Sequence, residues 1–451
     1  MNPFWTATLI FIISYAVIVS EKIHKTKVAL AGASLMLILK IVDQKEAFHS
    51  EELGIDYNVI FLLISMMMII GIMKRTGIFE YVAIKSAKIA KGEPFRIMAI
   101  FSVVTAVASA FLDNVTTVLL LAPVTLLVAD ELDMDPIPFL ITEALASNIG
   151  GTATLIGDPP NIMIASKARL TFMDFILHLA PVVIIIMIVY IYTIKLIFGR
   201  KLKVKEDLKK RIMEIQEKDL IKDPVLLRKC LAVLGITIFG FVIHGFLHFE
   251  PATIALAGAA LLFLISGEKP HDIFLEVEWP SIFFFIGLFI IVGGVVKVGL
   301  IEKMSRMMID LTGPTQTNMF TTSMVILWFS AIASAIVDNI PFVATMNPLI
   351  LDMANNIYHA GGAASHALPP ETIHNAVLMP VWWALALGAC LGGNGTAIGA
   401  SANVIIIGMA EKARKPISFL KFMAYGIPIM IETVVISMIY IWVRYYILTA
   451  S

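Results

Sequence analysis

The segment GGTATLIGDPPN spans Gly150–Asn161 inside the longer apolar stretch Ile137–Ala165 and is the most informative part of the sequence for the fold. Glycines permit unusual dihedral angles and close backbone approach, and Pro159 and Pro160 cannot continue a helix that arrives from the residues before them. A helix broken in this way leaves backbone N–H and C=O groups free, which hydrocarbon tolerates only where protein or a watery cavity buries them. We therefore expect a broken helix beside a cavity.

A second copy of this segment, GGNGTAIGASAN, spans Gly392–Asn403 at a shift of 242 positions. At a similar shift of 225 positions, SAFLDN at Ser109–Asn114 matches SAIVDN at Ser334–Asn339. A weaker third match, at a shift of 222, pairs three residues in each half: Gly71, Gly77 and Glu80 with Gly293, Gly299 and Glu302. Because the three matches keep their order along the chain, we predict an internal duplication.

The composition indicates a membrane protein. Of the 451 residues, 59% are hydrophobic and only 15% are charged, against roughly 25% charged residues in soluble globular domains. Lys+Arg and Asp+Glu are equal at 34 each, so the net charge does not indicate a nucleic-acid partner. The two cysteines, Cys230 and Cys390, support neither a disulfide framework nor a zinc site. We find no metal-ligand cluster and no nucleophile–base spacing, and we therefore expect an all-α polytopic membrane protein that is not an enzyme.

Twelve apolar stretches, several about as long as a bilayer core is thick, divide evenly around the hydrophilic interval Gly199–Lys229. They are Phe4–Ser20, Val28–Val42, Val59–Met73, Ile97–Val128, Ile137–Ala165, Phe175–Phe198, Leu231–Leu247, Ile254–Ser266, Ser281–Val298, Phe320–Met353, Ala376–Ala410 and Phe422–Leu448.

The distribution of Lys and Arg predicts the topology. If Ile97–Val128 and Phe320–Met353 are re-entrant hairpins and the other stretches each cross once, one set of loops holds 25 Lys and Arg residues and the opposite set holds 7. The first set is then cytoplasmic, both termini lie on the outer side of the inner (plasma) membrane, and the second half is inverted. The expected fold has about ten transmembrane helices plus two re-entrant hairpins and two broken helices.

This topology divides the chain into three parts. They are a first repeat, 1–198, with a cytoplasm-facing hairpin at 97–130 and a broken helix at 137–168; a cytoplasmic connector, 199–229; and an inverted second repeat, 230–451, with an outward-facing hairpin at 320–353 and a broken helix at 376–411.

Two acidic residues, Asp113 and Asp338, occupy equivalent positions within apolar stretches. A carboxylate at mid-membrane costs about 2.5–3.5 kcal/mol on insertion scales, so such a residue is by default a functional candidate. It can bind and release a proton once it is desolvated, or it can ligate a small hard cation. The alternative is that each Asp only caps the helix that follows it.

The two halves of this expected site differ, because Asp158 has Ala400 at the equivalent position and Thr116 has Pro341. Asp158 is either an additional proton or ion group or an N-cap that precedes Pro159 at the first helical position. The candidates for substrate binding lie on the hairpin tips and broken helices and offer hydroxyl, carboxamide or backbone groups: Asn114, Thr116, Thr117, Asn148, Gly150, Gly151, Thr152, Thr154, Asn161, Asn339, Gly392, Gly393, Asn394, Thr396, Ser401 and Asn403.

Three motifs resemble those of the ion transporter superfamily: AFLDNVTT around Asp113, GGTATLIGDPPN from Gly150 and GGNGTAIGASAN from Gly392. The resemblance extends over nearly the whole chain. More narrowly, they resemble its arsenical pump membrane protein (ArsB)/NhaD permease branch, which includes the melanosomal P protein. The resemblance implies two inverted repeats, hairpins that meet broken helices in a mobile transport domain, a dimerising scaffold domain and elevator-type movement. Dicarboxylate/sodium symporters of the superfamily carry Ser-Asn-Thr at the hairpin tips, whereas this chain has Asp-Asn at both.

The resemblance leads us to expect a secondary active transporter that exports arsenite or antimonite as the neutral trihydroxide in exchange for inward protons. The proton motive force would drive it without a cofactor, and two fixed carboxylates would repel a dianion by several kcal/mol at an effective dielectric constant near 20. The open alternatives are a sodium/proton antiporter, another anion or metalloid permease of the superfamily, and a channel or membrane subunit driven by a separate ATPase subunit. The expected partners are the small inorganic solute, membrane lipid and a second copy of the chain in a homodimer, but no nucleic acid.

Overall fold

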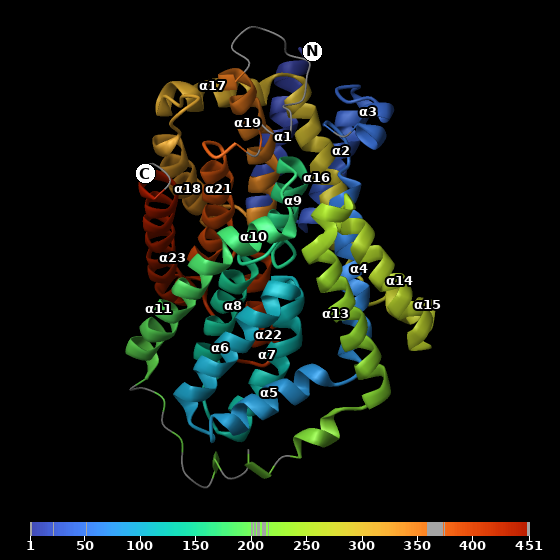
Figure 1. Ribbon diagram of the computed structural model, residues 1–451, viewed down its shortest axis with the longest axis vertical. Coiled ribbons are helices and arrows are strands. Elements are labelled where there is room, and N and C mark those ends of the chain that lie inside the picture. The colour runs from blue at the N-terminus through green and yellow to red at the C-terminus, as the bar shows by residue number, and fades with distance from the viewer. Residues whose placement is uncertain are drawn as a thin grey trace.

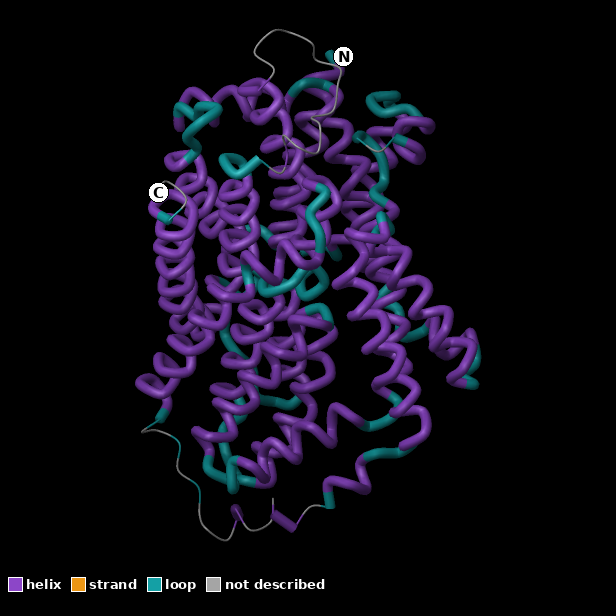
Figure 2. The backbone as a smooth tube through the Cα atoms, in the orientation of Figure 1, coloured by secondary structure: helices purple, strands orange, loops and turns teal. Residues whose placement is uncertain are grey.

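The structure is a computed structural model that describes residues 2–448, with the exception of residues 21, 51, 200–201, 203, 205–207, 210–212, 215, 359–372 and 374. Every regular element of the described residues is helical (Figure 2). The helices, in chain order, are α1 (Pro3–Ser20), α2 (Lys25–Ile38), α3 (Gln44–His49), α4 (Tyr57–Lys74), α5 (Ile78–Ile89), α6 (Pro94–Phe111), α7 (Asn114–Glu131), α8 (Ile137–Gly151), α9 (Pro159–Ala168), α10 (Phe172–His178), α11 (Ala180–Phe198), η1 (Glu217–Leu220), α13 (Pro224–Leu247), α14 (Pro251–Ser266), α15 (Pro270–Phe274), α16 (Trp279–Lys297), α17 (Leu300–Thr312), α18 (Phe320–Ile336), α19 (Asn339–Tyr358), α21 (Met379–Gly392), η2 (Gly393–Gly395), α22 (Ser401–Lys412), α23 (Phe419–Ile441) and η3 (Trp442–Ile447).

Eight of the described helices are long and apolar enough to cross a membrane. They are α1, α4, α6, α7, α11, α13, α16, and α23 continued by η3. The prediction of an all-helical, polytopic membrane protein is therefore confirmed.

Each segment that was predicted as a hairpin forms a pair of helices in contact, and the re-entrant course of these pairs in the membrane stays a prediction. Helices α6 and α7 are joined by Leu112 and Asp113, and helices α18 and α19 are joined by Val337 and Asp338. The Asp-Asn pair thus lies at the turn in each hairpin, as the sequence predicted.

The two glycine-rich segments interrupt helices as expected. Helix α8 ends at Gly151 and helix α9 begins at Pro159, while a short turn of 3₁₀-helix and Thr396–Ala400 separate α21 from α22. Glycine is required here because the neighbouring helix lies too close for a side chain. A Cβ atom on Gly150 would meet the backbone of Ala106 in α6, and one on Gly392 would lie 2.5–2.9 Å from the backbone of Ala331 in α18.

Several elements differ from the sequence-based expectations. The short helices α5 and α17 were not predicted, because neither is a long apolar stretch. The predicted stretch Phe175–Phe198 is divided into α10 and α11, and Pro181, which has no backbone N–H, lies in the first turn of the new helix, which begins at Ala180. Helix α13 begins at Pro224 and so extends into the predicted connector, of which residues 200–201, 203, 205–207, 210–212 and 215 lie outside the described residues.

The helices are arranged around the interrupted segments. Helix α2 packs on α16 and helix α4 on α14, while α6 packs on α8 and α18 on α21. The second helix of each hairpin contacts a half-helix of the other broken helix, because α7 packs on α22 and α19 on α9. Helix α5 lies at one end of the molecule, and α17 lies with the N-terminus at the opposite end (Figure 1).

Candidate functional site

The carboxamide of Asn148 connects both broken helices. Its Nδ2 atom donates hydrogen bonds to Oδ1 of Asn394 at 2.9 Å and to Oδ1 of Asn403 at 3.0 Å. Its own Oδ1 accepts a hydrogen bond from Asn114 Nδ2, at the hairpin tip, at 3.0 Å. All four side chains are almost completely buried. A chain of carboxamides therefore runs from the first hairpin tip through α8 to η2 and α22.

Two further carboxamides satisfy the backbone that the broken helices leave free. Asn161 Nδ2 donates to the carbonyl oxygens of Gly151, Thr152 and Thr154, at distances of 2.9–3.3 Å. In the second half, Asn403 Nδ2 donates to the carbonyl oxygens of two residues at 2.8 and 2.9 Å, Gly393 and Thr396. Buried carbonyl groups require such donors. These carboxamides were predicted to bind substrate, and in this structure their N–H groups bind the protein itself.

Hydroxyl groups at equivalent positions of the two halves donate hydrogen bonds between each hairpin and its neighbouring broken helix. Ser109 donates to the carbonyl oxygen of Ser147 at 2.7 Å, and Ser334 donates to that of Ala389 at 2.6 Å. Thr154 donates to the carbonyl oxygen of a hairpin residue, Ala110, and Thr396 donates at 2.5 Å to the equivalent residue, Ala335. Thr152 instead donates within its own helix, to the carbonyl oxygen of Asn148 at 2.7 Å.

Asp113 caps helix α7. Its carboxylate accepts hydrogen bonds from the backbone N–H of Thr116 at 2.8 Å and from the hydroxyl of Thr116 at 2.5 Å. The side chain is only 7% exposed. One residue further along the helix, the buried hydroxyl of Thr117 has no hydrogen-bond partner among the described residues. The capping alternative therefore applies to Asp113, although capping does not exclude a second role for a carboxylate that is buried in this way.

Asp158 lies at the N-cap position of α9 but makes no side-chain cap. Its carboxylate instead accepts hydrogen bonds from Nδ2 of Asn339, at the tip of the second hairpin, at 3.2 and 3.4 Å. It is 1% exposed and lies within electrostatic range of both Asp113 and Asp338. Asp158 therefore links the second hairpin tip to the first broken helix and brings the three predicted acidic residues into one site.

Asp338 has a cationic partner that sequence reasoning did not identify. The ammonium group of Lys25, at the start of α2, lies 2.7 Å from Oδ2 of Asp338 and also donates to the hydroxyl of Ser401 at 2.7 Å. Ser401 in turn donates to the same carboxylate oxygen at 2.9 Å. The sequence carries no local signal for this pairing, because the two charged residues are 313 positions apart.

A second charged residue reaches the site from outside the hairpins. Glu278, the N-cap residue of α16, lies within electrostatic range of Asp113 and Lys25. Burial raises the pKa of the Glu278 carboxyl, the charge of Asp113 raises it further, and the charge of Lys25 opposes both effects. The site therefore combines three carboxylates from hairpins and broken helices with one ammonium and one carboxyl group from α2 and α16.

The site is asymmetric where the two halves differ in sequence. The position equivalent to Asn148 is occupied by Cys390, whose thiol donates to Oδ1 of Asn161 at 3.5 Å. Ala400, the counterpart of Asp158, contributes no polar side-chain atom. The hydroxyl contacts that join each hairpin to its broken helix are therefore present twice, whereas the carboxamide of Asn148 and the third carboxylate are each present once.

In the described part of the chain, two helical hairpins meet two broken helices around buried carboxylates, and several further helices are apolar. These features define the class of protein as a multi-pass membrane transporter. The chain matches the family described as "CitMHS: Citrate transporter" over residues 15–371. It therefore belongs to the CitMHS family.

Individual relatives agree with this assignment. The chain is 46% identical over 442 residues to a Mycobacterium tuberculosis protein named Uncharacterized transporter Rv2684, covering 98% of this chain and 99% of that protein. It is 33% identical to the human P protein, covering 97% of this chain and 60% of that protein. The YdaH transporter of Alcanivorax borkumensis shares the fold, with a TM-score of 0.57 and 13% identity over 98% of each chain. The expected similarity to the P protein is confirmed, and the narrower ArsB/NhaD assignment stays a prediction.

Proposed function

We propose that this protein is a secondary active transporter that exports arsenite or antimonite, as the neutral trihydroxide, in exchange for protons. The observation that supports the proposal is the convergence of Asp113, Asp158 and Asp338 with a single lysine at two broken helices. The class of transporter follows from the family, whereas the solute and the coupling ion are the proposal.

Charge balance supports proton coupling. Three ionised carboxylates beside one ammonium group would leave a net charge of about −2 in a buried site. Like charges held together in a buried site of low dielectric constant repel one another. The site therefore lowers its free energy by binding a proton, and the carboxylates that hold and release it are the three aspartates.

The same charges favour a neutral solute over an anion. The family description names citrate, and a tricarboxylate anion would add to the repulsion among Asp113, Asp158 and Asp338. A neutral trihydroxide can donate hydrogen bonds to these carboxylates instead. The unpartnered hydroxyl of Thr117 and the carboxamides of the hairpin tips, Asn114 and Asn339, are the groups we propose to complete its binding.

The proposed mechanism is elevator-like alternating access in two inverted repeats. The recurring contacts of Ser109 with Ser147 and of Ser334 with Ala389 support the duplication, and the opposite ends occupied by α5 and α17 support the inversion (Figure 1). In this mechanism the hairpins and broken helices move as a body along α2 and α16. The contact between Lys25 and Asp338 joins the moving and fixed parts, so it must break in each cycle.

The proposed placement is the inner membrane with both termini on the outer side, and the proposed assembly is a homodimer through the scaffold helices. Because the sequence has no nucleotide-binding motif, ATP-driven transport would require a separate ATPase subunit. Flux that is abolished by an uncoupler in the absence of ATP supports the proton-driven mechanism. Flux that requires ATP, or that ignores the uncoupler as a channel would, contradicts it.

A sodium/proton antiporter is the second candidate, and one contact favours it. The ammonium of Lys25 shows that the oxygens of Asp338 and Ser401 together accept a monovalent cation at 2.7 Å. A sodium ion that displaced this ammonium would use the same oxygens.

Everted membrane vesicles distinguish these candidates. Vesicles with an acidic interior, from which protons flow outward down their gradient, are offered arsenite, sodium or citrate in separate assays. The proposal is supported if arsenite accumulates only in the presence of the gradient and if sodium does not dequench a dye that reports the acidic interior. Sodium-driven dequenching without arsenite accumulation rejects it in favour of the antiporter, and citrate accumulation alone rejects both.

A further inference from the structure

Glu143, outside the candidate site, is a buried glutamate with no charged partner. It lies on α8 and is 1% exposed. Its Oε1 atom accepts a hydrogen bond from the hydroxyl of Thr125 at 2.5 Å, and its Oε2 atom has no hydrogen-bond partner among the described residues. In the second half of the chain the equivalent position, at a shift of 242, is Leu385. The fold therefore does not require an acid at this position.

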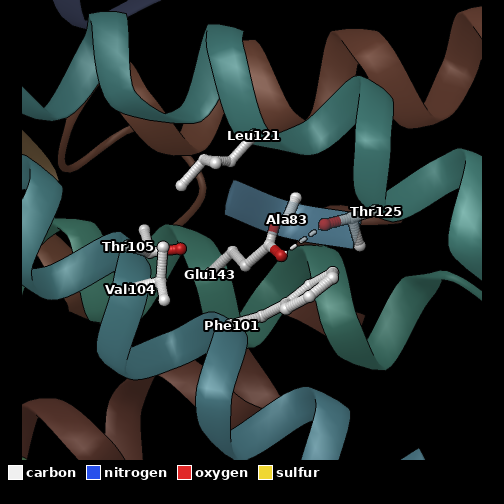
Figure 3. Close-up of a pocket in the computed structure, with 7 residues that line it drawn as sticks. All are labelled: Ala83, Phe101, Val104, Thr105, Leu121, Thr125 and Glu143. Carbon is white, nitrogen blue, oxygen red and sulfur yellow. Dashed lines mark hydrogen bonds between the residues drawn. The ribbon is translucent and has the colours of Figure 1, made fainter. Parts of the chain in front are cut away.

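The carboxyl group extends from α8 into a narrow space closed by three neighbouring helices (Figure 3). The lining residues come from α5, α6 and α7 and are mostly apolar: Ala83, Phe101, Val104, Thr105, Leu121 and Thr125. The space has no room for a water molecule. The hydroxyl of Thr105 has no hydrogen-bond partner among the described residues. An ionised carboxylate in such a place has neither water nor a cation to stabilise it, so the neutral acid is the favoured form.

The titratable groups around this space supply no compensating charge. Tyr190 on α11 donates to the carbonyl oxygen of Thr142 at 2.7 Å and lies within electrostatic range of Glu143 and Glu432. Glu432 on α23 accepts a hydrogen bond from Thr193 at 2.6 Å. The charged residues of the helices packed around Glu143 make no hydrogen bond or ion pair with it in the described part of the chain: Glu80, Lys85, Lys88, Arg96, Asp130, Glu131, Lys195, Glu411, Lys412 and Lys421.

We propose that Glu143 is a second proton-binding group of the transporter, which holds its proton while the space between α5, α7 and α8 is closed and releases it when water enters. This inference rests on the proposed proton coupling. On binding, a hydronium ion gives its proton to Oε2 and leaves as water, while Thr125 continues to donate to Oε1. On release, an entering water molecule takes the proton and leaves as hydronium. A metal ion fits this space less well, because three side chains offer it oxygen, whereas hard cations take six or more oxygen ligands.

Infrared difference spectroscopy of the purified full-length protein in liposomes tests the proposal without any substrate. Spectra are compared between acidic and alkaline buffers, and the carbonyl band of a protonated carboxyl group is followed. The wild-type protein should show a high-frequency component of this band, from a carboxyl group in an apolar environment. Glu143→Gln should lose that component, whereas the components of the three aspartates should remain. Glu302→Gln is the matched control, because Glu302 is exposed and paired with Arg306 within α17. This control should leave the band unchanged.

Transport assays then separate a proton-binding role from a structural one. Glu143→Gln keeps the shape of the side chain and its contact with Thr125, so a merely structural residue would tolerate it. We expect loss of the acidic limb of the pH profile of transport. An unchanged band and an unchanged pH profile in Glu143→Gln would overturn the proposal, as would a sodium-dependent response of the band.

A second variant keeps the test valid if Glu143→Gln does not fold. Thr125→Val removes the hydrogen bond to Oε1 but keeps the carboxyl group, so the band should move to higher frequency; an unmoved band contradicts the proposal. This test is independent of the transported solute. If the protein does not transport arsenite, the proposed function fails, but the infrared band and its change in Glu143→Gln are still measured.

Discussion

Replacing Lys25 with methionine removes the ammonium group that α2 offers to Asp338 while keeping the length of the side chain. The two charges lie 2.7 Å apart, and the side chains are only 26% and 12% exposed. At a charge separation of 4 Å and an effective dielectric constant of 20, the attraction is about 4 kcal/mol. Desolvation offsets part of this attraction, and hydrogen bonds to charged groups retain about 1.5–3 kcal/mol net. Lys25→Met should therefore destabilise the conformation in which Lys25 contacts the tip of the second hairpin and the start of α22 by about 1.5–3 kcal/mol.

A double-mutant cycle measures this interaction. Thermal unfolding in detergent is compared for Lys25→Met, Asp338→Asn and the double variant, and the coupling free energy should be about 1.5–3 kcal/mol. Lys27→Met is the matched control, because Lys27 is exposed and lies two residues further along α2. It should show no coupling to Asp338→Asn. A coupling free energy below about 0.5 kcal/mol for Lys25, as expected for a solvent-exposed pair, would refute the reasoning.

Three further changes test the bracing and the chemistry of the site. Gly392→Ala places a Cβ atom 2.5–2.9 Å from the backbone of α18 and should destabilise the protein by about 1–3 kcal/mol in thermal unfolding; the control Gly408→Ala meets nothing within 4 Å, and equal melting temperatures would contradict the close approach. Asn148→Leu leaves the carboxamide oxygens of two partners without a donor, which should cost roughly 1–3 kcal/mol for each unsatisfied group in the same assay, and an unchanged melting temperature would show that the amide chain is dispensable. Asp113→Asn can still accept the backbone hydrogen bond of Thr116, so the protein should fold normally but lose proton-coupled transport in vesicles; a wild-type transport rate and pH profile would exclude a proton role for this residue.

The sequence predicted most of the elements that build the site, because glycine, proline and intramembrane acids act locally. The boundaries of α6 and α7 lie within three residues of the predicted hairpin 97–130. The segment Gly150–Asn161 interrupts the helix where expected, and the close approach of α6 explains why position 150 is a glycine. Such features depend on a few residues that have few conformational alternatives.

Pairings between distant segments could not be predicted in the same way. Lys25 was counted only as one of the basic residues that set the topology, and nothing near it in the sequence indicates a partner at the tip of the second hairpin. Glu143 was not singled out, because it has no acidic counterpart in the second half, where Leu385 occupies the equivalent position. The rule that selected Asp113, an acid within an apolar stretch, would have found it. The donors of Asn148 and Asn161 were predicted to face a solute, whereas the broken backbone and neighbouring carboxamides use them. Their engagement depends on which carbonyl groups the fold leaves free, which is a tertiary property.

The close approach of Gly150 to α6 and of Gly392 to α18 has a consequence for experiments that follow motion. Helices whose backbones touch cannot slide past one another without a clash, so a spectroscopic label on α6 and one on α8 must report the same displacement. A separation between those two labels during turnover would mean that the hairpin detaches from its broken helix. Labels on α6 and on α13 would instead follow the displacement of the whole body relative to the scaffold.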